Sequence, residues 1–287
     1  MTRQPLRLAI IEAERILAGA GVASPRVDAE LIASHVLGVE RGKLMLVPLV
    51  DHQVIDAIGQ LVNRRAKRVP LQHLLGWAAL GDVTVEVGPG VFTPRPETEL
   101  MLVWGLEFLA NVPNPVVVDL CTGSGALALA VAAARPDAAV HGVELDSTAL
   151  AWARRNASAR ASFGETPVRL HAGDVTDVSL LVDMDDQVDL VLCNPPYVPV
   201  GTEVPPEVGE HDPFKAVFAG SDGLQVIKHV VHLAARLLRS GGAVAIEHDD
   251  THAESVPDLL RSRRVLTDVA DHNDLTGRPR YATAHRT

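Results

Sequence analysis

From Val116 onward the chain alternates between short apolar runs and helical patterns, and this alternation strongly limits the possible folds. Runs typical of buried strands, such as Val116–Leu120 and Val188–Cys193, are separated by segments with helical character, such as Ala126–Ala134 and Thr148–Arg160. Strands that are joined through helices form a mostly parallel sheet with helices on both faces. The sequence therefore predicts an α/β domain of the Rossmann-like class. The other predicted strands are 139–144, 168–171, 243–247, 265–269 and 280–283, and the other predicted helices are 224–239 and 254–261.

The N-terminal part of the chain has a different pattern. Apolar residues recur there at helical spacing, and Ser24-Pro25 and Gly38 are typical of a helix start and a helix end. Residues 83–87 then alternate, with three valines on one face, and residues 88–90 are typical of a turn. We expect a helical, substrate-binding domain over residues 1–75, a β-hairpin linker over 76–105 and the α/β domain over 106–287.

Composition excludes several classes of protein. The formal charge is −10, with 26 Lys and Arg against 36 Asp and Glu, which argues against a protein that grips nucleic acid directly. Charged residues interrupt the apolar stretch near the N-terminus, so the sequence predicts neither a signal peptide nor a membrane span, and a cytoplasmic location is expected. The two cysteines are too few for a disulfide framework or a four-cysteine zinc site.

A glycine-containing turn follows the strand at Val116–Leu120. It reads Cys121-Thr122-Gly123-Ser124-Gly125 and leads directly into an alanine-rich helix. Glu144 ends the next strand, where its carboxylate can accept hydrogen bonds from both hydroxyls of a ribose. The glycine turn and Glu144 together indicate a site for an adenosine-containing cofactor that lies over the ends of the two strands. Gly123, Gly125 and Ala128 also fit the dinucleotide pattern G-x-G-x-x-A, so a nicotinamide cofactor stays open at this point.

A second motif, Asn194-Pro195-Pro196-Tyr197, follows the strand at Val188–Cys193. The Asn194 side-chain oxygen and the Pro195 carbonyl can together accept both hydrogens of one NH2 group, because proline fixes φ and leaves its carbonyl free. Tyr197 offers a flat face to a planar amide or base. This motif favours methyl transfer to a planar NH2 group over hydride transfer.

These motifs resemble those of the family of N5-glutamine methyltransferases that modify peptide-chain release factors. The resemblance covers nearly the whole chain and includes Pro70-Leu71-Gln72-His73-Leu74-Leu75-Gly76, Pro89-Gly90-Val91-Phe92-Thr93-Pro94-Arg95-Pro96-Glu97-Thr98-Glu99, Ala219-Gly220-Ser221-Asp222-Gly223-Leu224 and Asp274-Leu275-Thr276-Gly277-Arg278-Pro279-Arg280. It implies a helical N-terminal domain, a hairpin and a seven-stranded methyltransferase domain that uses S-adenosylmethionine. The implied partners are class 1 release factors, methylated on the glutamine of their Gly-Gly-Gln motif.

The resemblance also implies roles for particular positions. Cofactor-binding residues would be Cys121, Thr122, Gly123, Ser124, Gly125, Glu144, Asp174, Val175 and Asn194. Substrate-binding residues would be Asn194, Pro195, Pro196 and Tyr197, of which Asn194, Pro195 and Tyr197 would be catalytic. Two departures stand out: Cys121 occupies a position where the family usually has glycine, and Glu247-His248-Asp249 stands where Glu-Ile-Gly is usual. We assign the second departure no role.

Other interpretations remain beside this one. An N6-adenine methyltransferase acting on nucleic acid shares the Asn-Pro-Pro-Tyr motif, although it lacks the Pro-Arg-Pro-Glu-Thr-Glu segment. No metal site is expected, because the acidic and histidine run 247–252 falls where a strand ends and a helix begins, a place suited to a capping aspartate. Cys121 and Cys193 end strands that are neighbours in a methyltransferase sheet, so their thiols could meet beside the cofactor.

Overall fold

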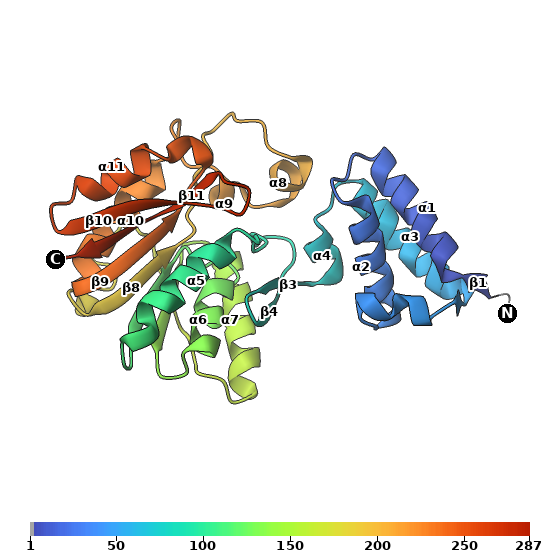
Figure 1. The fold of residues 1–287 in the computed structure, drawn as a ribbon, viewed down its shortest axis with the longest axis horizontal. Helices are drawn as coiled ribbons and strands as arrows, with labels where there is room; N and C mark the ends of the chain where they lie inside the picture. Colours follow the sequence, from blue (N-terminus) through green and yellow to red (C-terminus); the bar gives the residue numbers. More distant parts are fainter. Residues whose placement is uncertain (1–2) are drawn as a thin grey trace. The chain divides into compact units, whose positions relative to one another are not determined.

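The computed structural model describes residues 3–287 as two compact units (Figure 1). The smaller unit comprises residues 3–77 and Pro205–His211, and the larger comprises Ala78–Val204 and Asp212–Thr287. Within residues 3–287, no helix combines the length and the apolar composition needed to cross a membrane.

Three mutually packed helices build the smaller unit (Figure 1). Their apolar faces bury a core that contains Leu17, Ile32 and Ile58. The helix predicted from Ser24-Pro25 and Gly38 begins and ends at those residues, and Gly38 has the left-handed backbone, φ 64°, that glycine adopts without strain. The elements of the smaller unit are β1 (Gln4–Pro5), α1 (Leu6–Gly19), α2 (Pro25–Leu37), η1 (Arg41–Leu46), β2 (Leu49–Val50), α3 (His52–Ala66), α4 (Leu71–Leu75) and α8 (Pro206–His211).

A seven-stranded sheet forms the centre of the larger unit. Its strand order is β10-β11-β9-β8-β5-β6-β7, and all neighbours are parallel except β11, which runs antiparallel to β9 and β10. The strands are β5 (Val116–Leu120), β6 (Ala139–Glu144), β7 (Arg169–Ala172), β8 (Val188–Cys193), β9 (Leu238–Glu247), β10 (Leu266–Asn273) and β11 (Pro279–Arg286). The predicted Rossmann-like sheet is confirmed. Strand β9 begins five residues earlier than predicted, because residues 238–242 extend it.

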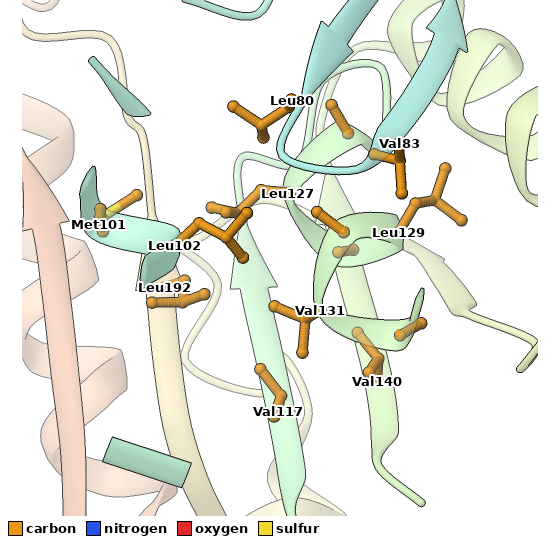
Figure 2. Packing of buried hydrophobic residues seen from close by; sticks show 14 of the residues in the cluster. Leu80, Val83, Met101, Leu102, Val117, Leu127, Leu129, Val131, Val140 and Leu192 are labelled. Carbon is orange, nitrogen blue, oxygen red and sulfur yellow. The ribbon is translucent and has the colours of Figure 1, made fainter. Parts of the chain in front are cut away.

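Helices cover both faces of this sheet. Alternate residues of the central strands enter different cores: Val117 and Leu192 pack with α5, α6 and the β3–β4 hairpin (Figure 2), whereas Val118 and Val191 pack with α10 and α11. This alternation follows from the two-residue side-chain period of a strand. The helices of the larger unit are α5 (Thr98–Phe108), η2 (Leu109–Asn111), α6 (Ala126–Ala134), α7 (Ser147–Ser162), η3 (Val182–Met184), α9 (Phe214–Val217), α10 (Gln225–Leu237), η4 (Asp250–His252) and α11 (Ser255–Arg261).

The hairpin consists of β3 (Trp77–Leu80) and β4 (Val83–Glu86). Val83, Val85 and Val87 are buried on one face, as their alternation predicts. The connection between the two strands lies at residues 81–82, where Gly81 has a φ of 55°. The predicted turn at residues 88–90 therefore follows the hairpin and does not close it.

Strand β5 lies between β6 and β8: the chain continues from β5 to β6 and β7 on one side and then crosses back to β8 on the other side of β5. Loops that leave the carboxyl ends of such strands diverge and open a crevice, which is the usual ligand site of this architecture. The carboxyl ends of β5, β6 and β8 are the ends that carry Cys121, Glu144 and Asn194.

Candidate functional site

A cavity of about 170 Å³ opens at the carboxyl ends of β5, β6 and β8 in the larger unit. Most of the residues proposed from the sequence for the cofactor and substrate line it: Cys121, Thr122, Gly123, Ser124, Glu144, Asp174, Val175, Asn194 and Pro196. Gly125, Pro195 and Tyr197 do not line it. The tertiary structure thus brings together segments that lie more than 70 residues apart in the chain.

The turn after β5 presents backbone to this cavity. Gly123 has a φ of 57°, and a Cβ atom added there would meet nothing within 4 Å. Gly125 has a φ of 82° and immediately precedes α6, where an added Cβ would lie 3.4 Å from Ala153. The first glycine therefore leaves room for a ligand to approach the main chain, whereas the second is favoured by its left-handed backbone, since a side chain there would meet Ala153 only at ordinary contact distance.

Glu144 supports the turn from the end of β6. Its carboxylate accepts hydrogen bonds from the Gly123 N–H at 2.8 Å and from the Asp146 N–H at 2.8 Å, one on each oxygen. Burial raises the pKa of Glu144, and these backbone bonds oppose the rise. Because each carboxylate oxygen has a second lone pair, the group retains acceptor capacity for ribose hydroxyls. The open glycine turn and this carboxylate fit the adenosine-containing cofactor inferred from the sequence.

Asp119 lies beneath the turn and was missing from the residues proposed for the site. Its Oδ2 atom accepts from the Thr122 hydroxyl at 2.5 Å and from the Ala128 N–H at 3.2 Å. Burial raises the pKa of Asp119 to about 7 despite these hydrogen bonds, and the nearby Glu144 charge adds to the rise. The sequence shows that Asp119 lies two residues before the turn, but it does not show how deeply the residue is buried.

The two cysteines meet at the same edge of the sheet. Leu120 pairs with Cys193 in the β5–β8 register, so Cys121 follows directly beside it. Burial, followed by a hydrogen bond with the Cys121 thiol, raises the pKa of the Cys193 thiol. Cys121 has a φ of 60°, a left-handed conformation that costs an L-residue about 1–2 kcal/mol. A glycine at this position would adopt the same backbone without that strain.

Asn194 is linked to two residues that sequence analysis did not place in the site. The Asn194 Nδ2 atom donates to the Thr98 hydroxyl at 3.0 Å, and that hydroxyl donates to Glu247 Oε2 at 2.7 Å. The Tyr197 hydroxyl donates to Glu247 Oε1 at 3.1 Å. Thr98 is part of the Pro-Arg-Pro-Glu-Thr-Glu segment and Glu247 ends β9, but no spacing rule connects either position with Asn194.

The segment that precedes Thr98 also takes part in the site. Phe92 and Pro94 line the cavity, and the Arg95 guanidinium lies over the Phe92 ring at 4.8 Å from its centroid. Arg95 also forms an ion pair with Asp212 at 2.6 Å. Asp212 is buried in this pair.

Two runs of charged residues have partners elsewhere in the structure. The acidic and histidine run at the end of β9 spreads out: His248 bonds Asp271 at 2.8 Å, and Asp249 caps η4 by accepting from the Thr251 N–H at 3.0 Å. Within residues 3–287, no group of His, Cys, Asp and Glu side chains has the arrangement of a metal site. In the basic run at the end of α3, Arg65 pairs with Asp28 at 2.7 Å.

Comparisons with known proteins agree with these observations. A family model described as the PrmC N-terminal domain matches residues 9–76, and one described as the methyltransferase small domain matches residues 84–210. A relative from Mycolicibacterium smegmatis, named release factor glutamine methyltransferase, is 53% identical over 100% of this chain and 99% of its own length. A relative of the same name from Mycobacterium tuberculosis is 47% identical over 98% of this chain and 91% of its own length.

A solved structure supports the fold. A 16S rRNA methyltransferase from T. thermophilus, in complex with AdoMet and guanosine, superposes with a TM-score of 0.54. The match has 23% sequence identity and covers 74% of this chain and 50% of the other. At this identity the comparison supports the architecture alone, which is that of a methyltransferase domain.

Proposed function

The chain belongs to the family of release factor glutamine methyltransferases, and on this premise we propose that it methylates a glutamine side-chain amide in a protein. The methyl donor is S-adenosylmethionine, and the proposed target is the glutamine of the Gly-Gly-Gln motif in class 1 peptide chain release factors. A release-factor substrate would place the reaction in the cytoplasm. We also propose that the helical domain, residues 1–75, contributes to binding the protein substrate.

One observation carries this proposal: Asn194 lies on the wall of the same cavity as the glycine turn and Glu144. The amide of a substrate that reaches Asn194 is therefore held beside the cofactor. When bound, S-adenosylmethionine supplies a methyl group activated by its attachment to a sulfonium sulfur. Gly123 and Glu144 are proposed to hold the adenosine part, and Asp174 and Val175 to lie beside the adenine.

The residues of the Asn-Pro-Pro-Tyr motif orient the acceptor. An amide nitrogen is a weak nucleophile, because its lone pair is delocalised into the carbonyl, so positioning must supply much of the rate enhancement. The Asn194 Oδ1 atom and the Pro195 carbonyl would each accept one hydrogen of the NH2 group and restrain the nitrogen. Aligned positioning of this kind contributes up to about 7–11 kcal/mol to lowering a barrier. These acceptors also favour the positive charge that grows on the nitrogen.

Family membership favours this function over N6-adenine methylation of nucleic acid. The net charge of −10 agrees, since direct binding of a polyanion depends on Lys and Arg. We therefore propose a protein partner, with no direct binding of nucleic acid.

Single-turnover methyl transfer with Asn194→Ala tests the proposal. Purified release factor, labelled S-adenosylmethionine and enzyme are combined, and the modified peptide is identified by mass spectrometry. Loss of one preorganised acceptor is expected to lower the transfer rate about 10²- to 10³-fold, while calorimetry shows a nearly unchanged cofactor affinity. Adenine-containing DNA serves as the competing acceptor.

Two outcomes would contradict the proposal. Methylation of the DNA without methylation of release factor would show that the substrate is a nucleic acid. Near-normal transfer by Asn194→Ala would remove Asn194 as the amide acceptor, and with it the main argument for a planar NH2 group as the target.

A further inference from the structure

Thr98 and Glu247 form a buried chain of hydrogen bonds behind Asn194. Thr98 is the first residue of α5 and Glu247 the last residue of β9, and both are almost fully buried, with 4% and 1% of their surface exposed. The chain runs from Asn194 Nδ2 to Thr98 Oγ1 at 3.0 Å and from Thr98 Oγ1 to Glu247 Oε2 at 2.7 Å. No part of the cofactor turn belongs to it.

The direction of these bonds follows from the groups that can donate. The carboxylate of Glu247 receives two hydroxyl donors, since Tyr197 donates to its second oxygen at 3.1 Å. Burial raises the pKa of Glu247 above its usual value, although the two hydroxyl donors and the nearby positive charge of Arg280 act in the opposite direction. Because each carboxyl oxygen of Glu247 accepts one hydroxyl, the Thr98 hydroxyl donates its single hydrogen to Glu247.

The consequence falls on the amide of Asn194. With its hydrogen committed, the Thr98 oxygen can only accept, so the amide must turn its NH2 group toward Thr98. The opposite orientation would place two acceptor oxygens against each other and leave buried groups unsatisfied, which is costly. The Asn194 Oδ1 atom is consequently left as the free acceptor on a residue that lines the cavity.

We propose that Thr98 and Glu247 are positioning residues that lock the Asn194 amide in the orientation that presents its oxygen to the substrate NH2 group. The inference deepens the proposed function and rests on it, because an NH2 substrate is what makes the orientation of Asn194 matter. Without the lock, a simple rotation of the side-chain amide would present a donor NH2 group to a substrate that is itself a donor.

Thr98→Val is the primary variant, because valine keeps the size and branching of threonine but removes the hydroxyl. We expect kcat for methylation of release factor to fall roughly 10- to 100-fold, in the range typical of misplaced catalytic groups, with KM for release factor and the affinity for S-adenosylmethionine little changed. Thr98→Ser, the matched control, retains the hydroxyl and is expected to recover most of the turnover lost with valine. Failure of serine to rescue would overturn the positioning role.

Two further measurements separate positioning from a general loss of structure. In the Asn194→Ala background, Thr98→Val should have no additional effect on kcat, because the group it positions is already absent; independent, multiplying effects would overturn the inference.

NMR of the ligand-free protein provides a readout without activity. The side-chain NH2 signals of Asn194, assigned by their loss in Asn194→Ala, should exchange with solvent faster in Thr98→Val than in Thr98→Ser.

Glu247→Gln tests the other end of the chain. A glutamine can donate from its NH2 group to the Thr98 oxygen, which frees the Thr98 hydroxyl to donate to Asn194 Oδ1. The Asn194 amide would then turn its oxygen toward Thr98 and its NH2 group toward the substrate. We expect kcat to fall at least as far as with Thr98→Val, and wild-type kcat in this variant would overturn the inference.

If the wild-type protein does not methylate release factor, the proposed function fails. If it does and these variants behave as wild type, only the positioning role fails.

Discussion

Asp119 shows how burial changes the chemistry of a single residue. The residue is 2% exposed near the end of β5, where burial raises the pKa of its carboxyl group from 3.8 to about 7. The folded protein therefore binds a proton at Asp119 more tightly than the unfolded chain does. The contribution of Asp119 to the free energy of unfolding is therefore fully present below about pH 4, and it is lost as the pH rises toward 7.

We expect Asp119→Asn to remove this pH dependence. Both hydrogen bonds reach one oxygen of Asp119, Oδ2, so the amide oxygen of asparagine can accept both. Relative to this variant, the wild type should lose roughly 4 kcal/mol of unfolding free energy between pH 4 and pH 7, since each unit of pKa shift corresponds to about 1.4 kcal/mol. Urea unfolding across this pH range, with exposed Asp183→Asn as the control, measures the difference. Parallel profiles for wild type and Asp119→Asn would contradict the assignment.

Helix α7 joins the hairpin to the cofactor turn through one buried residue. The Asn156 side chain accepts from the Glu86 N–H at 2.8 Å and donates to the Glu86 carbonyl at 3.0 Å. It also donates to the Ser124 carbonyl at 2.9 Å. Asn156 thus pairs with the Glu86 backbone of β4 in the way that a neighbouring strand would. The same side chain also binds the turn after β5. The packing of three elements depends on these bonds.

Asn156→Ala should therefore affect both stability and ligand affinity. Loss of the side chain leaves the Ser124 carbonyl without this partner in a buried place and removes two part-buried bonds to the Glu86 backbone. A buried group that finds no replacement costs about 1–3 kcal/mol. We expect a lower urea midpoint and a weaker affinity for S-adenosylmethionine, measured by calorimetry. Ser158→Ala, an exposed change on the same helix, is the matched control. If the two variants are equally stable and bind the cofactor equally well, Asn156 does not support the turn.

At the scale of the whole molecule, the compact units do not follow the order of the chain. Residues 205–211, which lie between two segments of the larger unit, group with the N-terminal helices. Glu207 of α8 explains this grouping, because it pairs with Arg65 at 2.8 Å and with Arg68 at 2.6 Å. Burial favours the neutral acid, but the hydrogen bonds from Arg68 and Arg65 hold the pKa of Glu207 below its usual value of 4.5.

The pairing predicts how α8 responds to acid. A lowered pKa means that stability from Glu207 is present above about pH 4.5 and is lost as the pH falls below it. At pH 7 we expect Glu207→Gln to speed amide hydrogen exchange in α8, as measured by mass spectrometry, with a loss of about 1–3 kcal/mol of local stability, less than for removal of a fully buried partner. Glu210→Gln, an exposed change on the same helix, should have little effect. Unchanged exchange in Glu207→Gln would show that the ion pairs do not hold α8.

Local patterns in the sequence were enough to predict much of this protein. The strand at Val188–Cys193, the helix at Ala126–Ala134 and the burial of Val83 and Val85 depend on side-chain periodicity, which neighbouring residues alone determine. The turn at Cys121–Gly125 could likewise be identified, because glycines after an apolar strand satisfy a backbone requirement that acts over a few residues. Most residues proposed for the site from these patterns lie around one cavity.

Only the tertiary structure decided which distant groups meet. Thr98 contacts Asn194 across 96 residues and Glu247 across 149, and neither contact has a local signature, because both depend on where α5 and β9 end in the folded sheet. The burial of Asp119 and the pairing of Glu207 with Arg65 arise in the same way. Periodicity determines which face of an element is buried, whereas hydrogen bonds and charge pairs between elements require the geometry that packing creates.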